Sequence, residues 1–144
     1  MVKKIIIVLL TVMVFFQAST IAIADENTQD ENTRLIAYYF YGSFRCPTCY
    51  NLEKYAKEAI ENNFKDELDK GILVFKAVNI EEKGNEHFVN DYQLYSKSLV
   101  LSLVKNGEEV KYKNLTKIWE YVRNKEKYLS YVKSEIDAFL KEIE

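Results

Sequence analysis

Between positions 35 and 80, two continuous apolar runs flank a segment whose apolar residues have helical spacing. The run Leu35–Tyr41 is apolar and aromatic, and Gly42 follows it, which predicts a buried strand. The segment Cys46–Phe64 carries apolar residues at i, i+3, i+4, i+7 and i+8 opposite a charged face, so it predicts an amphipathic helix. The run Ile72–Ile80 predicts a second strand. Its lack of clean alternation favours a strand covered on both faces.

The second half of the chain continues with shorter elements. Asn85–Leu94 predicts a short helix that buries Phe88, Val89 and Tyr92. Leu99–Val104 is almost continuously apolar and predicts a third strand. The Asn-Gly pair at positions 106 and 107 is typical of a tight hairpin, so Glu109–Lys113 should be an antiparallel partner of the third strand.

Two helices are expected after the hairpin. Asn114 is a suitable N-cap for a short helix whose core residues include Trp119. A last helix runs from about Lys125 to the chain end. The order is therefore β-α-β-α-β-β-α, with one more helix or a broken final one, which predicts a single α/β domain with a mixed central sheet flanked by helices. Since both crossovers between the first three strands are helical, these strands should be parallel, and the hairpin adds an antiparallel edge.

The first 24 residues do not fit this domain. Lys3 and Lys4 precede the apolar run Ile5–Phe16, and Ala22-Ile23-Ala24 places small residues before Asp25. This pattern predicts a cleaved secretory signal over residues 1–24, and the alternative is an uncleaved membrane anchor. The polar stretch 25–33 should be a flexible tether to a domain over residues 34–144. The domain is therefore expected outside the cytoplasm, periplasmic or secreted.

Composition and charge fit one globular domain without a nucleic-acid partner. The chain has 144 residues, of which 48% are hydrophobic, which is enough for a core. The formal charge of the whole chain is −2, and removal of Lys3 and Lys4 makes it −4. An acidic domain is not expected to bind nucleic acid or an anionic membrane surface.

Both cysteines of the chain, Cys46 and Cys49, fall in the motif C-P-T-C between the first strand and the first helix. Three interpretations remain open: redox exchange, an inert pair, or half of a metal site. A structural clip across two residues closes a very short loop and stabilises little. A closed zinc site needs four ligands, and His87 is the one imidazole available.

Proline is favoured at the first helical position, so Pro47 predicts that Cys46 is the helix N-cap. Its sulfur would then accept the N–H groups of Thr48 and Cys49 and lie at the positive end of the helix dipole. Arg45 is either a cation for this thiolate or a surface residue. All these effects lower a thiol pKa, so Cys46 is the expected nucleophile and Cys49 the resolving cysteine.

A C-x-x-C motif directly after a strand and at the start of a helix, within this element order, resembles the thioredoxin superfamily. The Lys-Asn-Gly hairpin after the third strand is similar as well. More narrowly, F-Y-G-S-F-R-C-P-T-C, with Asn85, Tyr92 and S-K-S-L-V-L, is similar to the thioredoxin-like family described as the ArsF subunit of a nitrophenyl-compound nitroreductase. This resemblance implies an electron-transfer or accessory role.

The sequence departs from thioredoxins at three places, the first of which is the motif: it is W-C-G-P-C in thioredoxin and F-R-C-P-T-C here. Thioredoxin-like folds carry a cis-proline before the third strand, but Tyr95-Ser96-Lys97-Ser98 stands there, so a trans loop is expected. Ser96 and Ser98 should supply hydroxyls near the sulfurs. Thioredoxins also bury a carboxylate on the first strand, and Leu35–Tyr41 has none.

The sequence thus predicts an extracytoplasmic thiol–disulfide oxidoreductase that exchanges disulfides with a partner protein, or passes electrons to a redox complex. No cofactor and no metal are expected, and contact with a membrane is expected only through an uncleaved signal. Tyr41, Phe44 and Tyr50 flank the cysteines and could form an apolar lip for the partner. The alternative function is a non-enzymatic docking subunit of an exported redox complex, with its cysteines idle or metal-bound.

Overall fold

The computed structural model describes residues 33–143, which hold four strands and five helices. In chain order these are β1 (Thr33–Tyr41), α2 (Pro47–Asn63), α3 (Lys65–Asp69), β2 (Leu73–Asn79), α4 (His87–Asp91), β3 (Ser98–Lys105), β4 (Glu108–Asn114), α5 (Ile118–Tyr121) and α6 (Lys125–Leu140). The predicted signal over residues 1–24 lies outside the described residues, as does the predicted tether apart from Thr33, which begins β1.

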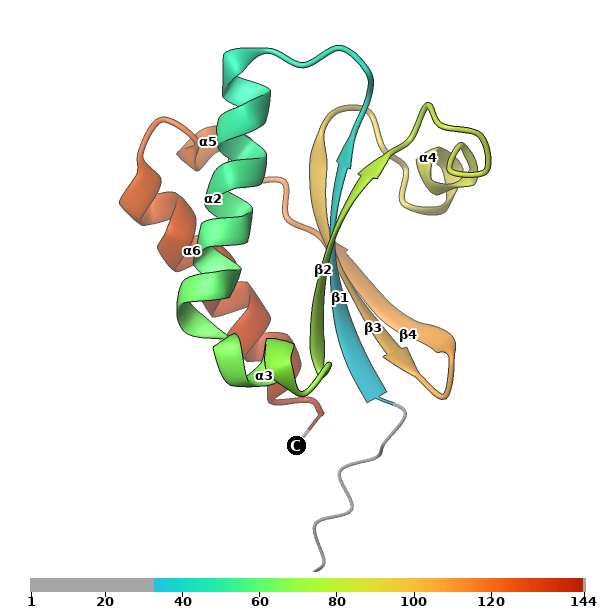
Figure 1. Ribbon diagram of the computed structural model, residues 1–144, viewed down its shortest axis with the longest axis vertical. Helices are drawn as coiled ribbons and strands as arrows, with labels where there is room; N and C mark the ends of the chain where they lie inside the picture. Colours follow the sequence, from blue (N-terminus) through green and yellow to red (C-terminus); the bar gives the residue numbers. More distant parts are fainter. Residues whose placement is uncertain (1–32, 144) are drawn as a thin grey trace, which may run out of the picture.

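The strands form one mixed sheet in the order β2-β1-β3-β4 (Figure 1). β1 pairs with β2 in parallel and with β3 antiparallel, so the prediction of three parallel strands is wrong for β3. The reason is the short connection. Tyr41 lies opposite Asn79, and Phe40 lies opposite Ser98, so β3 starts at the edge where β1 and β2 end. The five residues of α4 rise about 7.5 Å, too little to carry the chain back along the sheet.

β2 is an edge strand, because β1 is its one neighbour in the sheet. Its residues are half-buried or exposed, apart from the buried Leu73. The prediction of a strand covered on both faces is therefore wrong for β2. β3 fits that description instead, since seven of its eight residues are buried. A continuous apolar run identifies a strand but does not show where the strand lies in the sheet.

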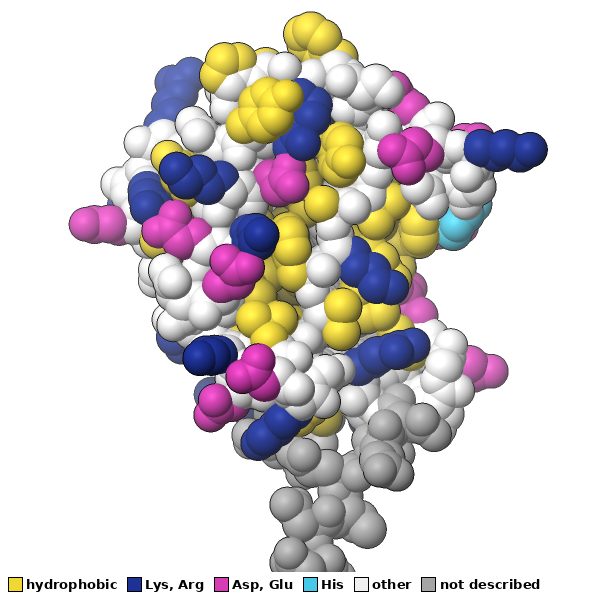
Figure 2. Space-filling view, viewed as in Figure 1, with side chains coloured by type: hydrophobic (Ala, Val, Ile, Leu, Met, Phe, Trp, Pro, Cys, Tyr) yellow, Lys and Arg dark blue, Asp and Glu magenta, His cyan; other side chains and the backbone are white. Residues whose placement is uncertain are grey.

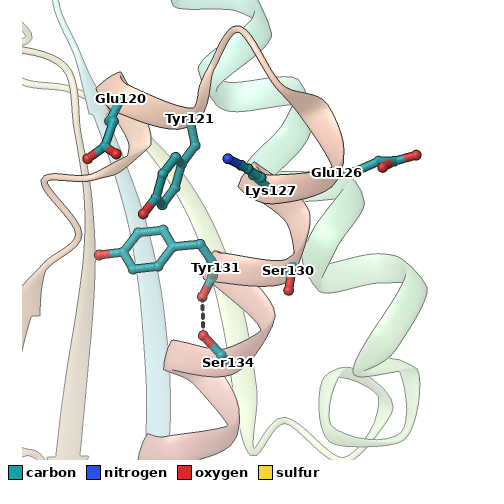
Figure 3. Close-up of a pocket in the computed structure, with 7 residues that line it drawn as sticks. All are labelled: Glu120, Tyr121, Glu126, Lys127, Ser130, Tyr131 and Ser134. Carbon is teal, nitrogen blue, oxygen red and sulfur yellow. Dashed lines mark hydrogen bonds between the residues drawn. The ribbon is translucent and has the colours of Figure 1, made fainter.

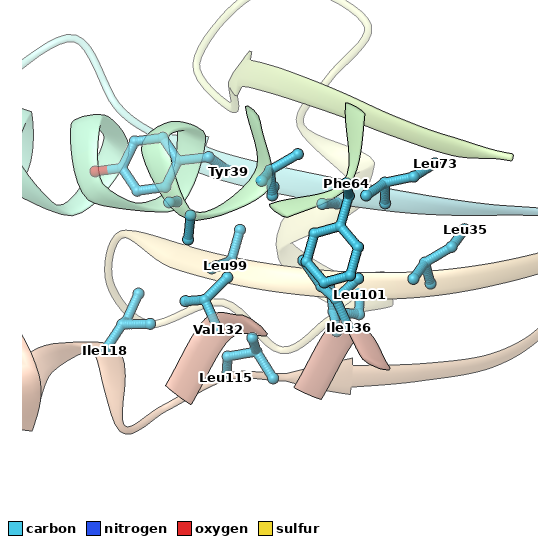
Figure 4. Packing of buried hydrophobic residues seen from close by; sticks show 14 of the residues in the cluster. Leu35, Tyr39, Phe64, Leu73, Leu99, Leu101, Leu115, Ile118, Val132 and Ile136 are labelled. Atoms are coloured by element: carbon cyan, nitrogen blue, oxygen red, sulfur yellow. The ribbon is translucent and has the colours of Figure 1, made fainter. Parts of the chain in front are cut away.

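The main core lies between one face of the sheet and the helices α2 and α6 (Figures 1 and 4). Strand residues of one parity supply the sheet side of it, and the apolar stripes of both helices supply the other. Its largest fully buried members are Tyr39, Tyr128, Leu35, Leu52, Ile60, Leu73, Leu99, Leu101, Leu115, Ile118 and Ile136. This packing fixes α2, and with it the cysteine motif, against the end of β1.

The opposite face of the sheet carries a smaller cluster beneath α4. Phe40, Tyr92, Leu94 and Val100 are buried there. The predicted short helix thus exists, but Tyr92 and Leu94 just after α4 are buried more deeply than the helical residues, which are half-buried or exposed.

Two predictions about the region after β4 are wrong. Asn114 is the last residue of β4 and not a helix cap, because the backbone N–H of Leu115 still bonds to the carbonyl of Leu99 in β3. α5 begins only at Ile118. Trp119 is not in the core either, since 40% of its surface is exposed. Its indole N–H instead donates to the Lys97 carbonyl at 2.9 Å.

Candidate functional site

The two cysteines lie at the first turn of α2, where the sequence places them. Cys46 is the N-cap with an extended backbone, Pro47 occupies the first helical position, and the Cys49 N–H donates to Cys46 Sγ at 3.3 Å. A cap sulfur that accepts a helix N–H is stabilised as the anion. Pro47 and the helix start therefore place Cys46 at a position that favours an anion.

The pKa of the Cys46 thiol is lowered from its usual value. The leading cause is the hydrogen bond from the Cys49 side chain, followed by the Cys49 N–H, and the Thr48 N–H contributes in the same direction. Desolvation opposes these effects. The thiolate is the reactive form of cysteine. A lowered pKa gives Cys46 a larger thiolate fraction at neutral pH than an ordinary cysteine has, which makes it the expected nucleophile.

Exposure separates the two sulfurs further. Both cysteines are free thiols, and Cys46 is half-buried whereas Cys49 is 2% exposed. A partner can therefore reach Cys46 directly, while Cys49 can be reached from Cys46. This is the arrangement that an attacking and a resolving cysteine need.

Arg45 is engaged by groups other than the sulfur. Its guanidinium lies between the rings of Tyr41 and Tyr50, at 4.4 Å from each ring centroid, and forms an ion pair with Glu53. It is not among the causes that lower the pKa of Cys46. Of the two roles left open by the sequence, this geometry favours a clamp that joins the loop before the cysteines to the first two turns of α2.

Glu53 and the buried Tyr39 were missed by the sequence analysis. Glu53 stands on the charged side of the helical pattern, and its partner lies eight residues earlier, outside helical spacing. Tyr39 counts as a core residue by pattern, yet its hydroxyl donates to the Cys49 carbonyl at 2.8 Å. Figure 4 shows its ring reaching from β1 to α2. A polar tip on a buried tyrosine is a signal for such a bond, but the pattern does not identify the acceptor.

A second carboxylate holds the loop between β1 and α2. Glu81 follows β2 and accepts the Ser43 N–H at 3.0 Å. The loop is thus fixed on one side by Glu81 and on the other by the Arg45 clamp. Phe44, between these two attachments, projects into solvent with 78% of its surface exposed.

The loop before β3 lies at the same end of the sheet. Ser98 Oγ donates to the Ser96 carbonyl at 3.0 Å, and Ser96 Oγ lies 3.4 Å from the Lys97 carbonyl. Each hydroxyl hydrogen is therefore directed to the loop's own backbone and not to sulfur. All peptide bonds of residues 33–143 are trans, which confirms the expected trans loop. A small pocket of about 140 Å³ lies between this loop and Trp119.

Large apolar side chains gather around the cysteine end. Figure 2 shows hydrophobic side chains at the top of the molecule, where the β1–α2 loop lies in Figure 1. Phe44 and Tyr50 are 78% and 56% exposed beside the cysteines, and Tyr95 before β3 is 94% exposed. Tyr41 is half-buried beneath Arg45, so the predicted lip consists of Phe44 and Tyr50 with Tyr41 as their support.

A second hollow lies away from the sulfurs, between α5 and α6 (Figure 3). Its volume is about 510 Å³, and it is open to solvent. Tyr121 and Tyr131 meet edge to face in it, with ring centroids 5.5 Å apart. Burial raises the pKa of Tyr131 to about 12. Neither cysteine lines this hollow, so it adds nothing to the thiol chemistry.

The described residues hold no group of three His, Cys, Asp or Glu side chains that could bind a metal ion together. His87, the one imidazole considered for such a site, pairs with Asp91 at 2.6 Å on the exposed side of α4. Residues 33–143 also hold no helix that is long and apolar enough to cross a membrane.

No protein-family model matches the chain, and no curated protein matches it. Among solved structures, it is similar to oxidised thioredoxin O2 from Arabidopsis thaliana, with 17% identity, a TM-score of 0.39, and 65% of this chain and 74% of that chain covered. It is also similar to Fasciola hepatica thioredoxin, with 22% identity, a TM-score of 0.39, and 65% and 82% covered. Because the identity and the TM-score are low, we describe the α/β fold by the strand order and pairing of this structure and not by these two neighbours.

Proposed function

We propose that this protein is a thioredoxin-like thiol–disulfide oxidoreductase that works outside the cytoplasm. The observation that carries the proposal is the geometry of the pair: an accessible Cys46 sulfur that accepts the Cys49 N–H at a helix start, with a buried thiol three residues on. The first 24 residues, with their basic start, apolar run and Ala-Ile-Ala end, support the location.

The reaction is a double exchange. The Cys46 thiolate attacks one sulfur of a partner disulfide, which forms a mixed disulfide and releases the other partner sulfur as a thiolate. The Cys49 thiol then loses its proton to solvent and attacks Cys46 Sγ, so that the Cys46–Cys49 disulfide forms and the second partner sulfur leaves as a thiolate, which can take up a proton from solvent. The partner gains two electrons and this protein loses two. The reverse sequence oxidises a partner dithiol.

Stabilisation of the Cys46 thiolate favours the reduced form of the pair. A pair whose reduced form is stabilised has a higher reduction potential and is the better oxidant. The proposed direction is therefore acceptance of electrons from partner thiols. A membrane-bound or soluble thiol acceptor would reoxidise the reduced pair.

The narrower resemblance to the ArsF-type family leads us to propose a subunit of an exported redox complex as the partner. The exposed Phe44 and Tyr50 beside the reachable sulfur support contact with a protein surface. A small-molecule substrate would need an enclosed site. The pocket near the β3 loop, at about 140 Å³, is smaller than the usual ligand cleft.

The test uses the two single-cysteine variants. Cys46→Ser should abolish reduction and oxidation of a model peptide disulfide, and Cys49→Ser should accumulate mixed disulfides that are seen as a mass increase on non-reducing analysis. Unchanged exchange by both variants would refute the redox function. If a co-purifying partner still binds when both cysteines are Ser, and exchange is absent in the native protein, the docking-subunit alternative is correct.

A further inference from the structure

Two buried tyrosine hydroxyls bind successive turns of α2. Tyr39, from β1, donates to the Cys49 carbonyl at 2.8 Å, and Tyr128, from α6, donates to the Leu52 carbonyl at 2.7 Å. Both tyrosines are fully buried. The first bond lies at the cysteine motif and the second lies three residues further along the helix. The two contacts are chemically alike but differ in their distance from the sulfurs.

The Tyr39 contact acts on Cys49, which is the proposed resolving cysteine and also a hydrogen-bond donor to the Cys46 sulfur. Cys49 accepts the Tyr39 hydroxyl with its carbonyl and donates its own N–H to Cys46 Sγ. The first turn of a helix is prone to fraying, because its N–H groups lack partners within the helix. A rigid donor on the strand that fixes the Cys49 carbonyl therefore limits movement of the Cys49 N–H relative to the sulfur.

The surroundings of Tyr39 make it a donor and not a base. Burial raises its pKa well above the usual tyrosine range, with Arg45 lowering it and Cys49 and Glu53 raising it further. The hydroxyl keeps its proton at any physiological pH, so it cannot accept the proton that Cys49 loses. Its contribution must therefore come from where it holds the backbone.

We propose that Tyr39 is a positioning residue for the cysteine pair: its hydroxyl fixes the Cys49 carbonyl and thereby keeps the Cys49 N–H on Cys46 Sγ. This inference rests on the proposed function for its biological meaning, but not for its test. The β1 strand thus supplies a fixed neutral donor beneath the motif. Tyr128 instead fastens the following turn, at the Leu52 carbonyl.

The test compares Tyr39→Phe with Tyr128→Phe in the reduced protein. Each change removes one buried hydroxyl and keeps the ring. The rate of Cys46 alkylation by iodoacetamide is measured against pH, with mass spectrometry to confirm the modified residue. Tyr39→Phe should move the midpoint upward and slow alkylation roughly threefold at pH values below it, because the thiolate loses an aligned donor. Tyr128→Phe should leave the profile of the native protein unchanged, although both variants melt at lower temperature.

Equal alkylation profiles for the two variants would overturn the proposal and leave Tyr39 with a purely structural role. If Tyr39→Phe does not fold, 3-fluorotyrosine at position 39 keeps the ring and the hydroxyl but makes a stronger donor. The midpoint should then move downward, and an unchanged midpoint overturns the proposal as well. The alkylation assay needs a reactive thiol and no partner. A failure of disulfide exchange with peptides is therefore a separate result.

Discussion

Replacement of Arg45 separates the two roles that its position allows. In the structure its guanidinium is stacked between Tyr41 and Tyr50 and paired with Glu53, and its side chain is 16% exposed. Arg45→Met keeps most of the alkyl chain and removes the charge and the planar group. If the clamp is structural, the variant loses stability and keeps the reactivity of the Cys46 sulfur.

The size of the loss follows from the contacts. Each cation–π contact contributes about 0.5–1 kcal/mol at a partly exposed site. The ion pair, whose Glu53 side chain is 26% exposed, contributes about 0.5 kcal/mol after solvent screening. Since the contacts share one side chain, we expect a total near 2 kcal/mol, which corresponds to a fall in melting temperature of roughly 8 °C.

The assay is urea unfolding of the reduced protein together with the alkylation rate of Cys46 at neutral pH. Arg45→Lys is the matched control, because it keeps the charge but loses the flat stack, and it should recover less than half of the lost stability. Alkylation should stay within about twofold of the native rate in both variants. Suppose instead that Arg45→Met slows alkylation more than tenfold and Arg45→Lys restores it. The charge then acts on the thiolate, and the clamp interpretation is refuted.

Three further predictions concern stability. Ser102→Ala should lower the free energy of unfolding in urea by about 1 kcal/mol, because Ser102 is 1% exposed and donates to the Glu109 carboxylate. The same change in a Glu109→Ala background should lower it clearly less. Gly42→Ala should lower the free energy of unfolding by about 1 kcal/mol, because the new Cβ would meet the Glu81 carboxylate and displace it from the Ser43 N–H. In a Glu81→Ala background, Gly42→Ala should lose most of this effect. The pKa of the Cys46 thiol is lowered by folding, so its stabilising effect is present above the ordinary thiol pKa of about 8.5 and is lost as pH falls through the folded value. The stability difference between the reduced protein and Cys46→Ser should therefore shrink on acidification, and a difference that is constant with pH would contradict a stabilised thiolate.

The sequence predicts the local features of the site well, because they depend on neighbouring residues. Pro47 at the first helical position predicts that Cys46 caps α2, and the structure has this cap, with Cys49 three residues on in the same first turn. Strand order is different, because it depends on where each connection leaves the chain in space. The short α4 reverses the chain, and this is why β3 is antiparallel to β1 although a helix precedes it.

The pattern of apolar and polar residues does not predict contacts between segments that are distant in the sequence. Trp119 fits an apolar helical pattern, but its indole N–H finds the Lys97 carbonyl 22 residues away and keeps the ring at the surface. Tyr128 is fully buried in α6, and its hydroxyl donates to the Leu52 carbonyl of α2, 76 residues earlier in the chain. In both cases a polar atom on an aromatic ring decides the position, and its partner is known only once the fold is formed.

The reduction potential of the Cys46–Cys49 pair tests the central claim most directly. The protein is equilibrated in graded glutathione buffers, and the thiols are counted after alkylation. We predict a reversible disulfide with a potential above the value of about −270 mV that is typical of thioredoxin, because the thiolate of Cys46 is stabilised. A pair that forms no disulfide in any of the buffers, or one whose potential lies below about −300 mV as in structural disulfides, would contradict the account.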